Sequence, residues 1–165
     1  MPTPTGGEKR WPTKAFKAHA VLTPHPGEMK RLARLIGRTD VPNDDAGRID
    51  VALAAANAFG QVVVLKGHRT VVTDGSRVYV NDTGDSSLSK AGTGDVLSGI
   101  LGTLLAQQMD RVEAACAAVW IHGKAGEICG SRMGRRGVLA MDVIAVLPEA
   151  LGAFESGANA TAKAR

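Results

Sequence analysis

The β-branched run over residues 61–66 constrains the fold of this chain more than any other segment. Its sequence is Gln-Val-Val-Val-Leu-Lys, and it is bounded by Gly60 and Gly67. A short apolar run without polar alternation is typical of a strand that is buried on both faces of a mainly parallel sheet. The run therefore predicts an α/β fold in which helices pack on a sheet.

The segments on either side supply the other elements of that fold. A short apolar run over 18–23 ends at Pro24, where a proline-rich loop forbids continuation of a strand or a helix. Two short segments on either side of Asp74-Gly75 predict a hairpin made of 70–73 and 77–80. Helical spacing or long apolar stretches predict five helices, over 28–36, 45–59, 96–109, 112–133 and 141–151.

Length and composition predict one domain. The chain has 165 residues, of which 44% are hydrophobic, and it is long enough to bury a core. Residues 1–17 lack periodicity and predict a disordered or non-native leader, while 152–165 predict a flexible tail, so the folded body is expected over 18–151. Cys116 and Cys129 lack metal-binding spacing, and we interpret both as small buried apolar residues outside any disulfide.

The charge pattern argues against nucleic acid as a partner. The net charge is +4, but residues 1–38 hold eight of the 20 lysines and arginines, and none of the six aromatic residues interleaves with them as a stacking platform requires. No apolar run approaches the roughly 18 to 20 residues that cross a membrane, and the first 17 residues have no apolar stretch typical of a secretory signal. We therefore expect a cytoplasmic protein without membrane partners.

A glycine-rich turn at 91–99 is the strongest candidate for chemistry. Its sequence is Ala-Gly-Thr-Gly-Asp-Val-Leu-Ser-Gly. Gly92 and Gly94 leave backbone N–H groups uncovered, and the following helix adds unpaired N–H donors and a partial positive charge, which together favour an anion. Asp95 can take a proton from a hydroxyl beside that anion. Alternatively, Asp95 is an ordinary first-turn carboxylate and the glycines only close a tight connection.

Three polar segments at strand ends can share a site with this turn, because the carboxyl ends of sheet strands usually gather a ligand. In the first, prolines hold His25 in place to bond a substrate, unless it is only an exposed loop histidine, and Glu28 can equally stabilise its helix N-terminus. The second places Lys66 at the end of the buried strand, where its ammonium can meet a phosphate or simply reach solvent. The third, 80–87, is rich in hydroxyls and carboxylates that can reach Mg²⁺ or phosphate, although such stretches are more often loops.

Two further segments have simpler interpretations. The basic stretch over 132–137 is interpreted first as a solvated connection and second as a phosphate contact. Trp120 and His122 lie among apolar residues of a predicted helix, and we expect both to pack in the core or at an interface.

Four motifs in order resemble the ADP/ATP-dependent NAD(P)H-hydrate dehydratase family, of the ribokinase-like superfamily. They are Thr-Pro-His-Pro-Gly-Glu at 23–28, Val-Leu-Lys-Gly-x-x-Thr at 64–70, the glycine turn at 91–99 and Val-Trp-Ile-His-Gly-x-Ala-Gly at 119–126. The resemblance covers about 18–151 and lacks the N-terminal part of the family domain. It implies a three-layer αβα fold with a mainly parallel central sheet, truncated on its N-terminal side.

The resemblance also implies a repair reaction. A nucleoside di- or triphosphate phosphorylates the hydroxyl of hydrated NADH or NADPH, and loss of that phosphate restores the nicotinamide double bond. Asp95 is implied to contact the hydrate and to serve as the base, while Gly92, Thr93 and Gly94 form the anion hole for the transferred group. His25 is implied to bind the hydrate.

The nucleotide is expected on a second set of residues. The family resemblance implies that ADP or ATP binds to Lys66, Gly67, His68, Arg69, Thr70 and Gly94. Mg²⁺ is expected with the phosphates, although the chain has no metal-ligand motif of its own. A homo-oligomer is also expected. Two alternatives stay open: a catalytically silent nucleotide-binding remnant or half-domain, and a related small-metabolite kinase such as a hydroxyethylthiazole kinase.

Overall fold

A four-stranded mixed sheet forms the centre of the molecule. The computed structural model describes residues 18–163, so the predicted leader over 1–17 lies outside the described residues. The strands are β1 (Val21–Leu22), β2 (Val62–Leu65), β3 (Val71–Thr73) and β4 (Val78–Val80), in the spatial order β1-β2-β3-β4. β1 pairs with β2 in parallel, whereas the β2–β3 and β3–β4 pairs are antiparallel.

The described sheet is therefore mixed, where a mainly parallel one was expected. Short loops join β2 to β3 and β3 to β4. A short loop reverses the direction of the chain, so the two strands that it joins can pair only in antiparallel fashion. The single parallel pair is connected through two helices, as parallel strands require.

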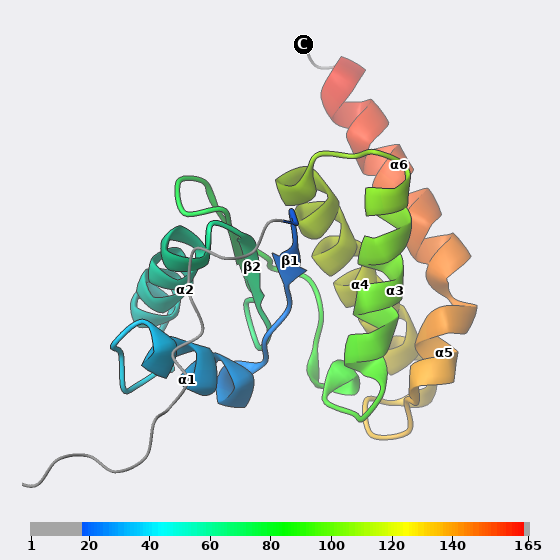
Figure 1. Cartoon of the computed structure of the whole chain (residues 1–165). Helices are drawn as coiled ribbons and strands as arrows, with labels where there is room; N and C mark the ends of the chain where they lie inside the picture. The colour runs from blue at the N-terminus through cyan, green and yellow to red at the C-terminus, as the bar shows by residue number, and fades with distance from the viewer. Residues whose placement is uncertain (1–17, 164–165) are drawn as a thin grey trace, which may run out of the picture.

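Helices cover both faces of the sheet (Figure 1). They are α1 (Pro26–Leu35), α2 (Asp45–Phe59), α3 (Thr93–Ala106), α4 (Arg111–Met133), α5 (Ala140–Ala145) and α6 (Leu147–Lys163), with a 3₁₀ turn η1 at Ser86–Leu88. α1 and α2 pack on one face, α3 and α4 pack on the other, and α5 and α6 lie against α4. This arrangement confirms the three-layer α/β/α class. Within residues 18–163, no helix has the length and apolar character needed to cross a membrane.

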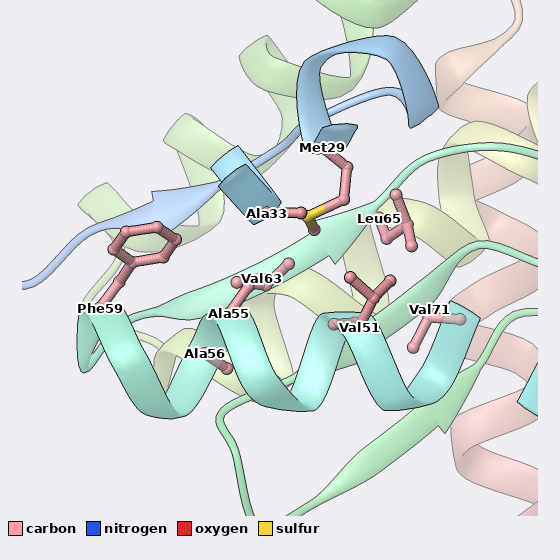
Figure 2. Packing of buried hydrophobic residues seen from close by; sticks show 10 residues of the cluster. Met29, Ala33, Val51, Ala55, Ala56, Phe59, Val63, Leu65 and Val71 are labelled. Atoms are coloured by element: carbon pink, nitrogen blue, oxygen red, sulfur yellow. The ribbon is translucent and has the colours of Figure 1, made fainter. Parts of the chain in front are cut away.

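Strand β2 shows why the fold has three layers. Val63 and Leu65 face α1 and α2 (Figure 2), while Val62 and Val64 face α3 and α4, and all four side chains are buried. Side chains alternate across a strand, so an unbroken apolar run feeds both layers at once. Small alanines of α2 at positions 52, 55 and 56 let that helix approach the strand closely.

Glycines on α4 let a polar loop lie directly on the helix. A Cβ on Gly123 would lie 2.7 Å from the backbone carbon of Thr83 and 2.8 Å from its oxygen, and a Cβ on Gly126 would lie 2.5 Å from Leu88 Cγ. Such distances are shorter than van der Waals contact, so only glycine fits. The segment over 81–88 is thereby held against α4.

The C-terminal region differs from its prediction in two ways. The helix expected over 141–151 is two helices, because Pro148 has no N–H and its ring blocks the carbonyl four residues earlier. The flexible tail expected over 152–165 instead continues α6 to Lys163. Its first turns pack on the core, where the Phe154 and Trp120 ring centroids lie 5.5 Å apart.

Candidate active site

A cavity of about 540 Å³ opens at the edge of the sheet where β1, β2 and β4 end. β1 and β2 run parallel, and β4 runs in the same direction as β2, so the loops that follow these three strands meet. Two backbone bonds connect the loops: Lys66 N–H donates to the Pro24 carbonyl at 2.8 Å, and Asn81 N–H donates to the Thr70 carbonyl at 2.9 Å. The start of α3 closes one side of the cavity.

Most of the residues singled out in the sequence meet in this cavity. Those that line it are His25, Lys66, Gly67, His68, Arg69, Thr70, Thr93 and Gly94. Gly92 and Asp95 do not line it, and both are exposed at the start of α3. The residues implied to hold the nucleotide thus lie together, while the proposed base lies beside the cavity on the solvent side of the same turn.

His25 is held by a helix cap as well as by its prolines. Its Nδ1 accepts the N–H groups of Gly27 at 3.0 Å and Glu28 at 3.2 Å, and Glu28 Oε2 accepts the His25 N–H at 2.7 Å. This reciprocal capping box also brings the ring Nε2 to 3.5 Å from Glu28 Oε1. The backbone hydrogen bond from His25 lowers the pKa of the Glu28 carboxyl, so Glu28 stabilises the start of α1 as a carboxylate.

Of the three residues expected to form the anion hole at the start of α3, Thr93 has no free donor. The Thr93 hydroxyl bonds the Leu88 and Lys90 carbonyls at 2.7 and 2.9 Å, and the Thr93 N–H donates to Lys90 at 3.4 Å. The Gly94 N–H finds no acceptor within the described chain. Lys66 Nζ lies beside Gly94, since a Cβ on this glycine would stand 3.3 Å from the ammonium nitrogen. An anion at this point is therefore favoured by one ammonium and one free backbone donor.

Arg48 of α2 is a residue that sequence reasoning missed. Its guanidinium donates to the carbonyls of Leu65 at 3.2 Å, Lys66 at 3.3 Å and His68, so it lies directly under the loop over 66–70. An arginine on a predicted amphipathic helix is usually a solvated charge, and no local pattern distinguishes this one.

His122 lines the floor of the cavity and is only 9% exposed. His122 was expected to pack in the core, and it is buried as expected. Its ring also lines the cavity. Its Nε2 is buried without a hydrogen-bond partner in the described part of the molecule. Burial lowers the pKa of His122 to about 4, so the ring is neutral at physiological pH.

This buried imidazole predicts a loss of stability in mild acid. The unfolded chain takes up the proton near pH 6.5, whereas the folded chain takes it up only near its pKa of about 4, so falling pH favours unfolding through that window. The contribution of His122 to the free energy of unfolding falls by about 3 kcal/mol from above pH 6.5 to below pH 4. Urea denaturation at pH 7, 5.5 and 4.5 measures this loss, and His122→Phe should reduce it. Equal losses in wild type and variant would contradict the assignment.

No ready-made metal cage is present among residues 18–163, where no three His, Cys, Asp or Glu side chains come together. The carboxylate that lines the cavity, Asp85, already pairs with Arg135 at 2.9 Å and accepts the Ser87 N–H at 2.8 Å. Mg²⁺ is commonly bound through one or two carboxylates and substrate phosphates, so Asp85 would hold such an ion only together with the phosphates of a ligand.

Comparison with known proteins agrees with the fold and identifies a family. A family model described as NAD(P)H-hydrate dehydratase matches residues 7–149. An ADP-dependent (S)-NAD(P)H-hydrate dehydratase of Neisseria meningitidis is 44% identical over 125 residues, which are 74% of this chain and 41% of that protein. A bifunctional NAD(P)H-hydrate repair enzyme of Moorella thermoacetica is 40% identical over 82% of this chain and 25% of its own length.

Solved structures agree. An ADP/ATP-dependent NAD(P)H-hydrate dehydratase of Bacillus subtilis, co-crystallised with ATP and Mg²⁺ and soaked with CoA, matches with a TM-score of 0.73 and 32% identity, over 82% of this chain and 49% of that one. A hydroxyethylthiazole kinase of Pyrococcus horikoshii matches with a TM-score of 0.68 at 23% identity, which bears on the fold alone. The architecture is thus that of the ribokinase-like α/β proteins.

Within that class, the chain belongs to the NAD(P)H-hydrate dehydratase family, since the family model covers most of it. It spans less than half the length of the curated relatives it matches.

Proposed function

We propose that this chain takes part in the nucleotide-dependent repair of hydrated NADH and NADPH. The observation that supports this most is the cavity in which the loop over 66–70 meets the start of α3, in a chain of the dehydratase family. Residues 18–151 then form the C-terminal portion of the dehydratase domain. We further propose that the chain is cytoplasmic and forms a homo-oligomer.

The nucleotide occupies the cavity in this proposal. Lys66, Gly67, His68, Arg69, Thr70 and Gly94 line it, and they supply an ammonium, a guanidinium and backbone donors. Lys66 is only partly buried, and its Nζ lies 3.9 Å from Glu28 Oε2, which is too long for a hydrogen bond. Its ammonium is therefore available to a phosphate. Mg²⁺ bound with the nucleotide would offset the charge of the phosphate oxygens.

The hydrate binds on the outer side of the glycine turn. His25 bonds it, and Asp95 takes the proton from its hydroxyl, after which the oxygen attacks the terminal phosphorus of ATP or ADP. A C–O–P ester forms and the shortened nucleotide leaves. The ester then loses phosphate together with a proton from the neighbouring carbon, which restores the double bond of the ring. The free Gly94 N–H and the Lys66 ammonium stabilise the charge on the transferred group.

A direct assay tests the activity. The purified chain is incubated with ATP or ADP, Mg²⁺ and hydrated NADH, and the recovery of dihydronicotinamide absorbance is followed. Recovery that depends on the nucleotide supports the proposal. An ADP-dependent rise in melting temperature without recovery would overturn the repair activity and favour a silent nucleotide-binding module. Transfer of phosphate to hydroxyethylthiazole, with none to the hydrate, would favour the small-metabolite kinase.

A further inference from the structure

The buried guanidinium of Arg48 has a defined set of partners. The side chain is 7% exposed and reaches from α2 to the end of β2. It donates to the carbonyl oxygens of Leu65 at 3.2 Å, Lys66 at 3.3 Å and His68. Three carbonyl groups of this segment are therefore oriented by one side chain.

These bonds decide where the N–H groups of the loop point. In a trans peptide, the carbonyl of one residue and the N–H of the next point in opposite directions. With the Lys66 and His68 carbonyls directed at Arg48, the N–H groups of Gly67 and Arg69 are directed away from it. Both residues line the cavity, and neither N–H has an acceptor within residues 18–163.

Two residues of the loop over 66–70 have positive φ angles. Gly67 has a φ of 141° and Arg69 a φ of 55°. Positive φ is rare for a residue with a side chain, so Arg69 is held in a conformation that needs support from its surroundings. A Cβ on Gly67 would lie 2.9 Å from Arg48 Nη2, so the guanidinium fits directly beneath the peptide that it orients.

The charges around the loop also favour an anion. Arg48 makes no ion pair within the described chain, because the carboxylate one turn earlier, Asp45, pairs with Arg69 at 2.6 Å. Burial lowers the pKa of Arg48, yet a guanidinium stays protonated at neutral pH. A buried cation without a carboxylate is costly, and an anion above the loop offsets part of that cost.

We infer that Arg48 is a positioning residue for phosphate, which aims the Gly67 and Arg69 N–H groups at a phosphate group of the bound nucleotide. This inference rests on the proposed function only in that the ligand carries phosphate. Arg48 does not touch the ligand and acts through the backbone that it holds. Lysine cannot replace it, because a single ammonium lacks the planar fork that bonds several carbonyls at once.

Calorimetric titration with adenosine, ADP and pyrophosphate tests the role. Arg48→Lys should weaken ADP and pyrophosphate binding about tenfold each, the loss expected for charge-assisted bonds to two backbone donors, and should leave adenosine binding unchanged. Arg34→Lys, on the exposed side of α1, is the matched control and should bind all three ligands as wild type does. An equal loss for adenosine and ADP in Arg48→Lys would show a merely structural role and overturn the inference.

A second variant covers the case in which Arg48→Lys does not fold. Gly67→Ala keeps the guanidinium but crowds it and strains the loop, so it should show the same selective loss of pyrophosphate binding. Unchanged pyrophosphate affinity in this variant would overturn the inference, as would wild-type protein that binds no pyrophosphate. Wild-type protein that binds ADP and pyrophosphate but repairs no hydrate would overturn the proposed activity alone, and the Arg48 variant would still decide the inference.

Discussion

Gly123→Ala is expected to lower the free energy of unfolding by about 3 kcal/mol, near the upper end of the range for overpacked sites. The new Cβ would stand 2.7 and 2.8 Å from the backbone carbon and oxygen of Thr83, and backbone atoms cannot rotate away as a flexible side chain can. The loop that carries Asn81 and Thr83 would have to leave α4. Thermal unfolding should show a fall in Tm of about 10 °C.

Gly99→Ala is the matched control for this change. It lies within α3, and a Cβ there meets nothing within 4 Å. Alanine is the better helix former by about 1 kcal/mol, so this control should keep or raise the Tm. Because both substitutions add one methyl group to a helical glycine, their difference isolates the contact with Thr83. A Gly123→Ala chain as stable as Gly99→Ala would contradict the close packing.

Asp95→Asn is expected to lower the rate of hydrate repair by about 10²- to 10⁴-fold, the range for loss of a general base. The amide keeps the shape of the carboxylate but cannot accept the proton of the attacking hydroxyl. Asp95 does not line the cavity, so the rise in Tm that ADP causes should be the same in the variant and in wild type. Turnover and thermal shift, measured on the same preparations, separate catalysis from nucleotide binding.

Asp40→Asn is the control for Asp95→Asn, because it makes the same change at an exposed carboxylate that does not line the cavity. It should retain wild-type turnover. Equal turnover in wild type and Asp95→Asn would remove Asp95 as the base. A smaller ADP shift in Asp95→Asn would instead place its side chain in contact with the nucleotide.

Local patterns were sufficient to predict most elements of the fold. The helix expected over 45–59 is observed as α2, from Asp45 to Phe59, because an Asn-Asp pair and a glycine limit it at both ends. The buried strand was predicted within one residue at each end. The parallel character of the sheet was overestimated, since the predicted hairpin already required antiparallel pairs. The break at Pro148 follows from backbone sterics, but a continuous apolar pattern concealed it.

The candidate site was only partly visible in the sequence. His25, Lys66 and Gly94 could be placed in one cavity because all three follow strand ends or open a helix, and those positions gather at one edge of a sheet. Arg48 lies inside a helix, where no local signal marks it. Gly123 belongs to the motif at 119–126, but that motif does not indicate which segment packs on the glycine. Their roles depend on partners far along the chain, which are the loop over 66–70 for Arg48 and Thr83 for Gly123. Only the tertiary structure reveals such contacts.

The cavity has one wall on each side of the sheet, and this division affects how the molecule fluctuates. The loop over 66–70 is attached through Arg48 to the α2 layer, whereas His122 and Gly123 belong to α4 in the opposite layer. A nucleotide bound as proposed would contact both walls. In the free chain the two layers can open separately, so their amide hydrogens should exchange with solvent at different rates. When a ligand fills the cavity and contacts both layers, the amide hydrogens of both layers should exchange at the rate of the layer that opens more slowly.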